Sequence, residues 1–168
     1  YPGRLKDILG IWVEESDALP EEEANSFTYK GKTYPASILC DLLHLQGAES
    51  LSSYESDFYE GMPVLTCNQF GEGKAYYVAA SSNKEFYSAF LSDICAELSI
   101  KPVIQAPEGV EATLRENENG KYLFLLNHGE KDAEVTLEAA GVDLISGKAY
   151  RAGDVVILAK ADVAIIRH

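Results

Sequence analysis

The chain has 168 residues, 46% of them hydrophobic, so it is long and apolar enough to form a buried core. Acidic residues outnumber basic ones 27 to 14, which gives a formal net charge of −13 at pH 7. A chain this acidic repels phosphate backbones, which excludes nucleic acid as an expected partner.

The first part of the chain predicts a series of short elements. Gly10 marks the end of a short helical turn near the start of the chain, because glycine is favoured just after a helix. In chain order, we expect a loop at 1–3, one helical turn at 4–9, a strand at 11–13, an acidic loop at 17–25, a small exposed hairpin at 27–34, and strands at 38–45 and 51–54.

Residues 63–80 carry the most recognisable local pattern, that of a β-hairpin. Two runs rich in β-branched and aromatic residues flank the turn sequence Gly71-Glu72-Gly73. The second arm, residues 75–80, is almost wholly apolar, which is typical of a strand buried on both faces. We therefore expect this arm to be an inner strand, with the rest of the chain before Asn83 packed around it.

Residues 85–99 predict the clearest helix in the chain. Apolar residues recur there with a period near 3.6, and Asn83 stands where an N-cap is expected. Pro102 and Pro107 bracket the segment that follows, and the composition changes after it. We place a domain boundary here, with residues 1–106 in one domain and 107–168 in the other.

The second domain is predicted to contain strands alone. Turn signals such as Gly120, Gly141 and Gly153 separate short apolar runs. The expected strands are 111–115, 122–127, 134–137, 142–144, 155–158 and 163–167. Many short strands in so few residues predict a small antiparallel β-sandwich or open barrel.

The three cysteines, Cys40, Cys67 and Cys95, show neither a C-x-x-C spacing nor an even count. This argues against a disulfide framework and a zinc site, and favours a reducing, cytoplasmic compartment. All three lie in apolar runs, so we expect them to be buried small hydrophobic residues. The chain has no apolar stretch of about 18 residues and no basic-then-apolar leader, so we expect neither a membrane span nor a signal peptide.

Nucleophilic catalysis requires an activated Ser or Cys with a base in reach, and no G-x-S-x-G or G-x-C-x-G elbow is present. His44 follows Cys40 and Asp41 closely, but neighbours in sequence rarely assemble into a triad, so a structural role is favoured for His44. The other two histidines, His128 and His168, lie at a strand-to-turn junction and at the terminus.

Carboxylate pairs are the other candidates, because glycoside hydrolysis uses two carboxyl groups across a cleft. The candidate pairs are Glu14 and Glu15, Glu116 and Glu118, and Asp154 and Asp162. Adjacent strand residues point to opposite faces, so Glu14 and Glu15 are not expected to share a site. Four tyrosines expected to be exposed, and so able to stack on sugar rings, are Tyr54, Tyr59, Tyr76 and Tyr77.

Several phrases together resemble the C-terminal portion of glycoside hydrolase family 42 β-galactosidases. Their order and spacing also match, and the resemblance covers nearly the whole chain. The phrases are LGIWVEE at 9–15, CDLLHLQGAE at 40–49, DFYEGMP at 57–63, NQFGEGKAYYV at 68–78, GVEATLR at 109–115 and YLFLLNH at 122–128. Ser16 is a departure, since an aromatic residue is expected there.

The resemblance implies an α+β chain: a partial amidotransferase-like, flavodoxin-like α/β trimerisation domain in 1–106, then the terminal β-domain in 107–168. It also implies that the (β/α)8 barrel with the two catalytic glutamates is absent from this sequence. We therefore assign no catalytic, cofactor-binding or metal-binding residue. The expected partner is a second copy of the chain, in a homotrimer in the parent. A β-galactoside is expected to bind only through the missing barrel.

Two alternatives stay open. The first is a carbohydrate-binding module in 107–168, although Tyr122, Phe124 and Tyr150 are its only aromatic residues, and two of them alternate on what is predicted to be a core face. The second is a small-molecule enzyme of the amidotransferase-like class that uses Cys40 or Cys67.

Overall fold

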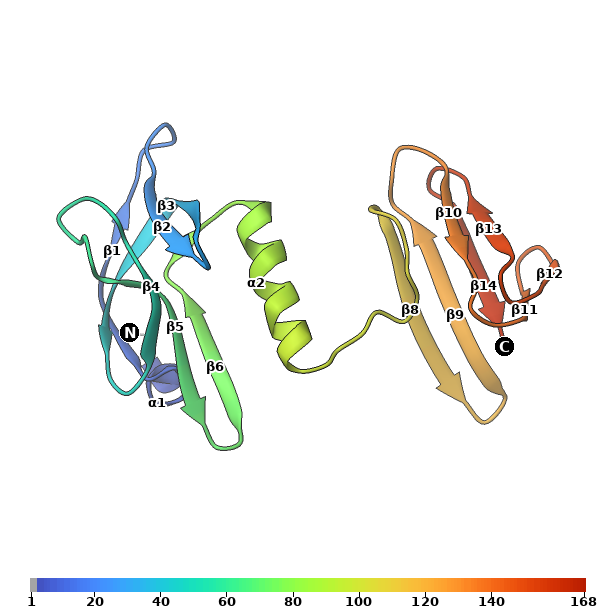
Figure 1. Cartoon of the computed structure of the whole chain (residues 1–168), viewed down its shortest axis with the longest axis horizontal. Coiled ribbons are helices and arrows are strands. Elements are labelled where there is room, and N and C mark those ends of the chain that lie inside the picture. Colours follow the sequence, from blue (N-terminus) through green and yellow to red (C-terminus); the bar gives the residue numbers. More distant parts are fainter. Residues whose placement is uncertain (1–2) are drawn as a thin grey trace. The chain divides into compact units, whose positions relative to one another are not determined.

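The computed structural model describes residues 3–168, and the chain divides into two compact units, unit 1 up to Ile94 and unit 2 from Cys95 (Figure 1). Each unit has its own cluster of buried apolar side chains. Strands take up 50% of the structure and helices 13%. Most of the loop predicted at 1–3 lies outside the described residues.

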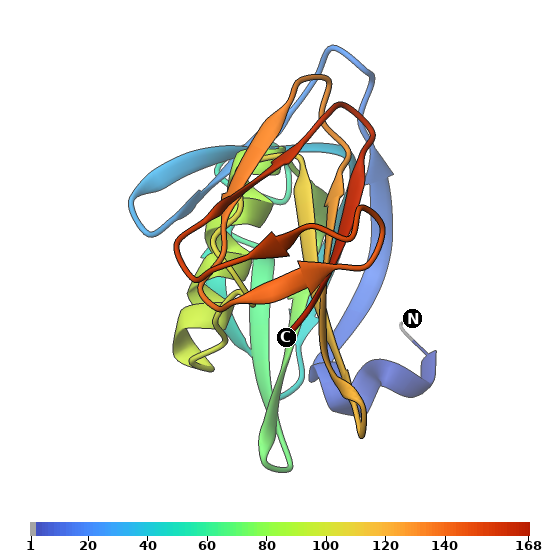
Figure 2. The ribbon, with the colours of Figure 1, turned by 90° about the vertical axis from the view of Figure 1, so that its right-hand side faces the viewer.

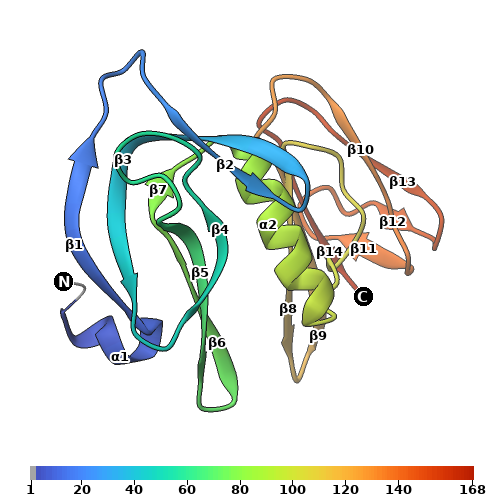
Figure 3. The same cartoon turned by 60° about the vertical axis from the view of Figure 1, so that its left-hand side comes forward.

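Unit 1 contains two small sheets, the short helices η1 and α1, and α2 up to Ile94 (Figure 3). One sheet has the order β1-β3-β2, with β7 also paired to β3, and the other has the order β4-β5-β6. The elements are η1 (Gly3–Leu5), α1 (Lys6–Leu9), β1 (Ile11–Ala18), β2 (Asn25–Tyr29), β3 (Lys32–Leu45), β4 (Glu49–Ser53), β5 (Pro63–Phe70), β6 (Gly73–Val78), β7 (Ala80–Ser81) and α2 (Lys84–Glu97).

The predicted fold class, with a flavodoxin-like α/β domain in the first part of the chain, is wrong. All the described strand pairs of unit 1 are antiparallel. A parallel pair needs a crossover of about a dozen residues or more, usually a helix. Here two-residue turns join β2 to β3 and β5 to β6, and at the first turn Lys30 and Gly31 both have positive φ, as a tight hairpin requires.

The hairpin predicted at 63–80 is confirmed as β5 and β6, but the position of its second arm is not. Strand β6 lies at the end of the β4-β5-β6 order and is half-buried, whereas β5 lies between two neighbours and has buried Val64, Leu65 and Thr66. The apolar side chains of β6 therefore pack against the core of unit 1, although β6 is an edge strand of its sheet.

The exposed hairpin predicted at 27–34 is also present, but Phe27 and Tyr34 are buried. They meet the α2 side chains Phe86 and Phe90 in a cluster of aromatic rings. The helix predicted at 85–99 is confirmed as α2, and the Asn83 side chain caps it by accepting a hydrogen bond from the Phe86 N–H at 3.0 Å.

A carboxylate joins α2 to the β2–β3 hairpin at the edge of this cluster. Asp93 Oδ2 accepts a hydrogen bond from the Tyr29 hydroxyl at 2.9 Å and pairs with Lys30 Nζ at 2.8 Å. Partial burial, with the nearby Asp93, raises the pKa of Tyr29 to about 12.

Unit 2 is built from antiparallel strands in two sheets that share one core (Figures 1 and 2). The larger sheet has the order β12-β11-β14-β9-β8, and β10 pairs with β13. The six strands predicted there are all present, and β12 is an additional one. The bounds are β8 (Val110–Asn117), β9 (Gly120–Asn127), β10 (Ala133–Thr136), β11 (Gly141–Asp143), β12 (Ala149–Tyr150), β13 (Val155–Leu158) and β14 (Val163–Arg167).

Asp143 ends β11 and is the one buried carboxylate among the described residues of unit 2. Its Oδ1 accepts hydrogen bonds from the N–H groups of Ile145 and Ile165, and its Oδ2 accepts from the N–H and hydroxyl of Ser146. Burial by itself raises the pKa of Asp143, but these four hydrogen bonds outweigh it and hold the pKa below its ordinary value.

The first prediction concerns Gly10, which has a φ of +62° and lies against Asn68 and Ala48. A Cβ at Gly10 would be 2.6 Å from Asn68 Cγ and 2.8 Å from the Ala48 nitrogen, so Gly10→Ala should reduce the free energy of unfolding by about 2–4 kcal/mol. The control is Gly31→Ala, which has similar backbone strain but nothing within 4 Å of its Cβ and should cost only about 1 kcal/mol. Denaturant unfolding measures the free energy of unfolding of both variants. Equal losses in the two variants would show that the close contacts of Gly10 do not matter.

A second prediction concerns pH. Because the folded-state pKa of Asp143 is lowered, its stabilisation is present above the unfolded-state pKa of about 3.9 and is lost as the pH falls through the folded-state value. Asp143→Asn should cost about 1–3 kcal/mol at neutral pH and make acid unfolding less steep. Asp132→Asn, at an exposed site in the same unit, is the control and should change neither quantity.

Candidate functional site

The structure separates the thiol and the imidazole that sequence proximity brought together. Cys40 is 0% exposed, and burial raises the pKa of its thiol. His44 lies four residues further along β3, roughly 13 Å away for an extended strand. Its exposed ring contacts Trp12, and its Nε2 lies 2.6 Å from Glu14 Oε2. Cys40 and His44 therefore form no catalytic pair.

The candidate carboxylates hold local structure. Glu116 pairs with Lys121 across the β8–β9 hairpin at 3.4 Å. Asp154 accepts a hydrogen bond from the Arg151 N–H at 2.7 Å, and Asp162 accepts one from the Val163 N–H at 2.8 Å. Glu14 contacts the His44 ring, as described above. None of these carboxylates lines the hollows of about 390, 550 and 620 Å³ described below.

The four tyrosines expected to be exposed are not available to a sugar. Tyr54 and Tyr59 are buried against each other, with ring centroids 4.9 Å apart. Tyr76 is half-buried against Phe90, and the half-buried Tyr77 donates a hydrogen bond to Asp41. These side chains support the core instead of forming a platform.

Two aromatic residues of unit 2, Tyr122 and Phe124, lie on the opposite face of their strand from the one predicted. Leu123 and Leu125 are in the core, so the alternating Tyr122 and Phe124 lie on the other face of β9, where they are half-buried. Tyr150 packs against the core. The expectation that Tyr122 and Phe124 face the core is therefore wrong.

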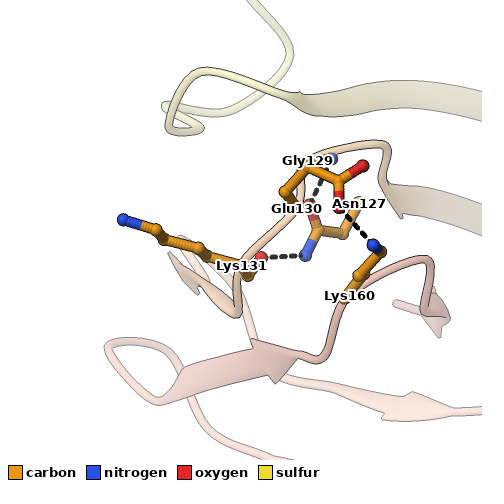
Figure 4. Close-up of polar contacts among 5 residues, drawn as sticks. All are labelled: Asn127, Gly129, Glu130, Lys131 and Lys160. Carbon is orange, nitrogen blue, oxygen red and sulfur yellow. Dashed lines mark hydrogen bonds and ion pairs between the residues drawn. The ribbon is translucent and has the colours of Figure 1, made fainter.

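A hollow of about 550 Å³ in unit 2 lies beside Asn127 and is lined by residues 107–109 and 129–134. Figure 4 shows the polar contacts there. The Asn127 amide donates to the Lys131 carbonyl at 2.8 Å, its Oδ1 accepts from the Gly129 N–H at 2.9 Å, and Glu130 pairs with Lys160. The Asn127 amide also donates to the carbonyls of Leu158, the last residue of β13, and of Ala159. These contacts fix the loops, and they leave no Asn127 donor for a ligand.

A hollow in unit 1, of about 390 Å³, was not expected from the sequence. Asp41 lies in it and accepts hydrogen bonds from the Ser16 hydroxyl and from the Tyr77 hydroxyl at 2.5 Å. Ser16, noted only as a departure from the family pattern, is thus the partner of Asp41. Leu39 and Tyr87, both partly exposed, also line this hollow.

Several large apolar side chains of unit 1 are exposed and lie outside its buried core. A second hollow, of about 620 Å³, is lined partly by Leu43, Leu45 and Met62. The exposed side chains include Trp12, Ile38, Leu39, Leu45, Phe58, Phe70 and Leu91. Exposed aromatic and aliphatic side chains of this kind are the ones that protein–protein interfaces bury.

Neither a metal site nor a membrane span is seen in the part of the chain that the structure describes. Across residues 3–168, no three His, Cys, Asp or Glu side chains are grouped so that they could hold a metal ion. None of the helices there combines the length and apolarity needed to cross a bilayer.

Comparison with known families assigns both parts of the chain. Residues 1–101 match the model described as the β-galactosidase trimerisation domain, and residues 109–168 match the β-galactosidase C-terminal domain.

Individual proteins agree with this assignment. β-Galactosidase BgaP of Planococcus sp. strain L4 is 42% identical over 166 residues, which are 95% of this chain and 25% of that protein. β-Galactosidase Pbg of Clostridium perfringens is 42% identical over 159 residues. The crystal structure of β-galactosidase from Bacillus circulans sp. alkalophilus matches all of this chain with a TM-score of 0.87 and 35% identity, over 26% of its own length. The chain therefore spans about a quarter of its relatives.

A third prediction follows from the burial of Cys40. In the native protein its thiol should react with an alkylating reagent at least ~10-fold more slowly than the half-buried Cys67 and Cys95, because only an accessible thiolate reacts. Peptide mapping by mass spectrometry after a timed reaction measures this, with the denatured chain as the control. A native Cys40 that reacts as fast as Cys67 would revive the cysteine-enzyme alternative.

Proposed function

The chain belongs to the glycoside hydrolase family 42 β-galactosidases, and from this premise we propose that it is the assembly part of such an enzyme. It holds copies of the enzyme together and supports a catalytic barrel that is not among these residues. The enzyme of which it is part hydrolyses terminal β-D-galactosides, and the substrate binds through that barrel.

The observation that carries the proposal is the match of residues 1–101 to a trimerisation domain. The exposed apolar side chains of unit 1 support it, because a lasting oligomer buries well over 1,000 Å² of largely apolar surface. We propose a homotrimer, assembled through unit 1.

The proposal also includes the domain boundary and the compartment. We place the domains at 1–106 and 107–168, supported by family matches that end at 101 and resume at 109. Three free cysteines favour the reducing cytoplasm. The charge of −13 disfavours nucleic acid and anionic membrane surfaces as partners.

A second candidate, a carbohydrate-binding role for unit 2, is favoured by one observation. Tyr122 and Phe124 lie on the face of β9 that is turned away from the core. Alternate residues of one strand are roughly 7 Å apart, so the two rings could contact one sugar. Titration with galactose and lactose, followed by tyrosine fluorescence, distinguishes this role from assembly, for which no saturable change is expected.

The fourth prediction is that the purified chain self-associates and has no galactosidase activity. Since copies carrying a charge of −13 repel one another, raising the salt concentration from about 0.01 to 0.1 M should strengthen association severalfold by shortening the screening length from about 30 to 10 Å. Sedimentation velocity over a range of concentrations measures the effect. A chain that stays monomeric at every concentration and salt would contradict the proposal, as would turnover of a β-galactoside.

A further inference from the structure

Strand β8 forms one edge of the five-stranded sheet of unit 2, with β9 as its single strand neighbour among the described residues (Figure 1). Its register with β9 runs without a shift from Val110 to Asn117, it contains no proline, and its residues are exposed or half-buried. Proteins usually interrupt a long edge strand with a bulge or a proline, because its unpaired N–H and C=O groups can accept another strand. The β8 edge has neither device.

The outward backbone groups of β8 belong to alternate residues. The Val110 N–H donates to the Pro107 carbonyl at 3.1 Å, so it is turned away from β9. In an antiparallel pair, residues that bond to the neighbouring strand alternate with residues that do not. The other residues of β8 whose N–H and C=O groups point away from β9 are therefore Ala112, Leu114 and Glu116.

Two opposite charges lie on β8 at equal distances from its centre. Glu111, Thr113 and Arg115 share the outer face of the sheet, because the alternate residue Ala112 packs against the core. Glu111 is exposed, and its Oε2 lies 3.2 Å from His128 Nε2. Arg115 is also exposed and forms no ion pair within residues 3–168. A negative and a positive side chain thus lie two positions on either side of Thr113.

We propose that β8 pairs with β8 of a second copy of this chain, antiparallel and about a two-fold axis at Thr113. In this register Glu111 of each copy lies opposite Arg115 of the other, which forms two ion pairs across the contact. Ala112 lies opposite Leu114, so residues with outward N–H and C=O groups face each other and can bond. The contact joins two five-stranded sheets into one continuous sheet.

The charges of β8 select a second copy as the occupant of this edge. A strand that pairs with itself about a two-fold axis must be complementary to its own reversed sequence, and β8 meets this condition around Thr113. Sliding the pair by two residues in either direction puts Glu111 opposite Thr113 or Asn117, and both ion pairs are lost. Charge complementarity therefore determines both the partner and the register.

This contact goes beyond the proposed function. A two-fold contact uses the same surface on both copies, whereas each contact in a ring of three joins two different surfaces. The β8 pair is therefore separate from the trimer contact assigned to unit 1, and the two contacts together join trimers in pairs.

The first test traps the register in the 168-residue chain. Thr113→Cys places two thiols opposite each other at a non-hydrogen-bonded pair, where Cα atoms lie about 4.5 Å apart, within the range that a disulfide bridges. Mild oxidation with oxidised glutathione should link copies through position 113, and mass spectrometry of the linked peptides identifies the bond. The matched control is Thr136→Cys in β10, which is more exposed than position 113 and should stay unlinked.

The second test exchanges the charges. Glu111→Arg should raise the dissociation constant of the pair about 10-fold in sedimentation equilibrium, because like charges then face each other at two sites. Arg115→Glu should do the same. The double variant should restore association, since it exchanges the two charges and keeps them complementary. Glu134→Arg makes the same change of charge in β10 and, as the control, should not weaken association.

The outcomes separate this inference from the proposed function. If Thr113→Cys does not link, or the double variant associates as weakly as the single variants, the β8 pairing is wrong, while trimers formed through unit 1 still support the proposed function. If copies link at position 113 and no trimer forms, the inference stands and the proposed trimer fails. If the 168-residue chain links there but the whole enzyme that contains it does not, the rest of the protein covers β8 and a second copy is not its partner.

Discussion

Strand β3 holds unit 1 together because its two halves pair with different neighbours. Residues 32–36 pair with β2, residues 39–45 pair with β1, and β7 joins near the bend. Side chains from both halves, including Tyr34, Ala36, Cys40 and Leu43, enter one buried cluster. Between the two halves the register of β3 shifts, and Ile38 at this point has a φ of +67°, so a bulge separates the two pairings of one strand.

Local elements could be predicted from the sequence because their signals are local. The turn glycine Gly71, the cap residue Asn83 and the 3.6-residue period after it correctly marked β5, β6 and α2. The neighbours of each strand could not be predicted in the same way. The apolar run in β6 was taken for an inner strand, and β3 was expected as two separate pieces, because a pattern along one segment does not identify the segment beside it.

The burial of individual side chains could not be predicted either, and this affected the candidate site residues most. Alternation shows that Tyr122 and Phe124 share one face and Leu123 and Leu125 the other, but it does not show which face is covered. Tyr54 is buried for a similar reason, since its cover comes from Tyr59 and from the carbonyl of Ala79, 25 residues away. The resemblance identified the family correctly, but the α/β fold expected from it does not apply to these residues.

The bend in β3 also links the two strand pairings on either side of it. Asp17 of β1 and Ala80 of β7 both pair with Cys40, the residue that follows the register shift. Loss of the extra residue would turn the side chains after it to the opposite face, because side chains alternate along a strand, and Cys40 and Leu42 would leave the core. The two pairings of β3 therefore form and open together, as one cooperative unit.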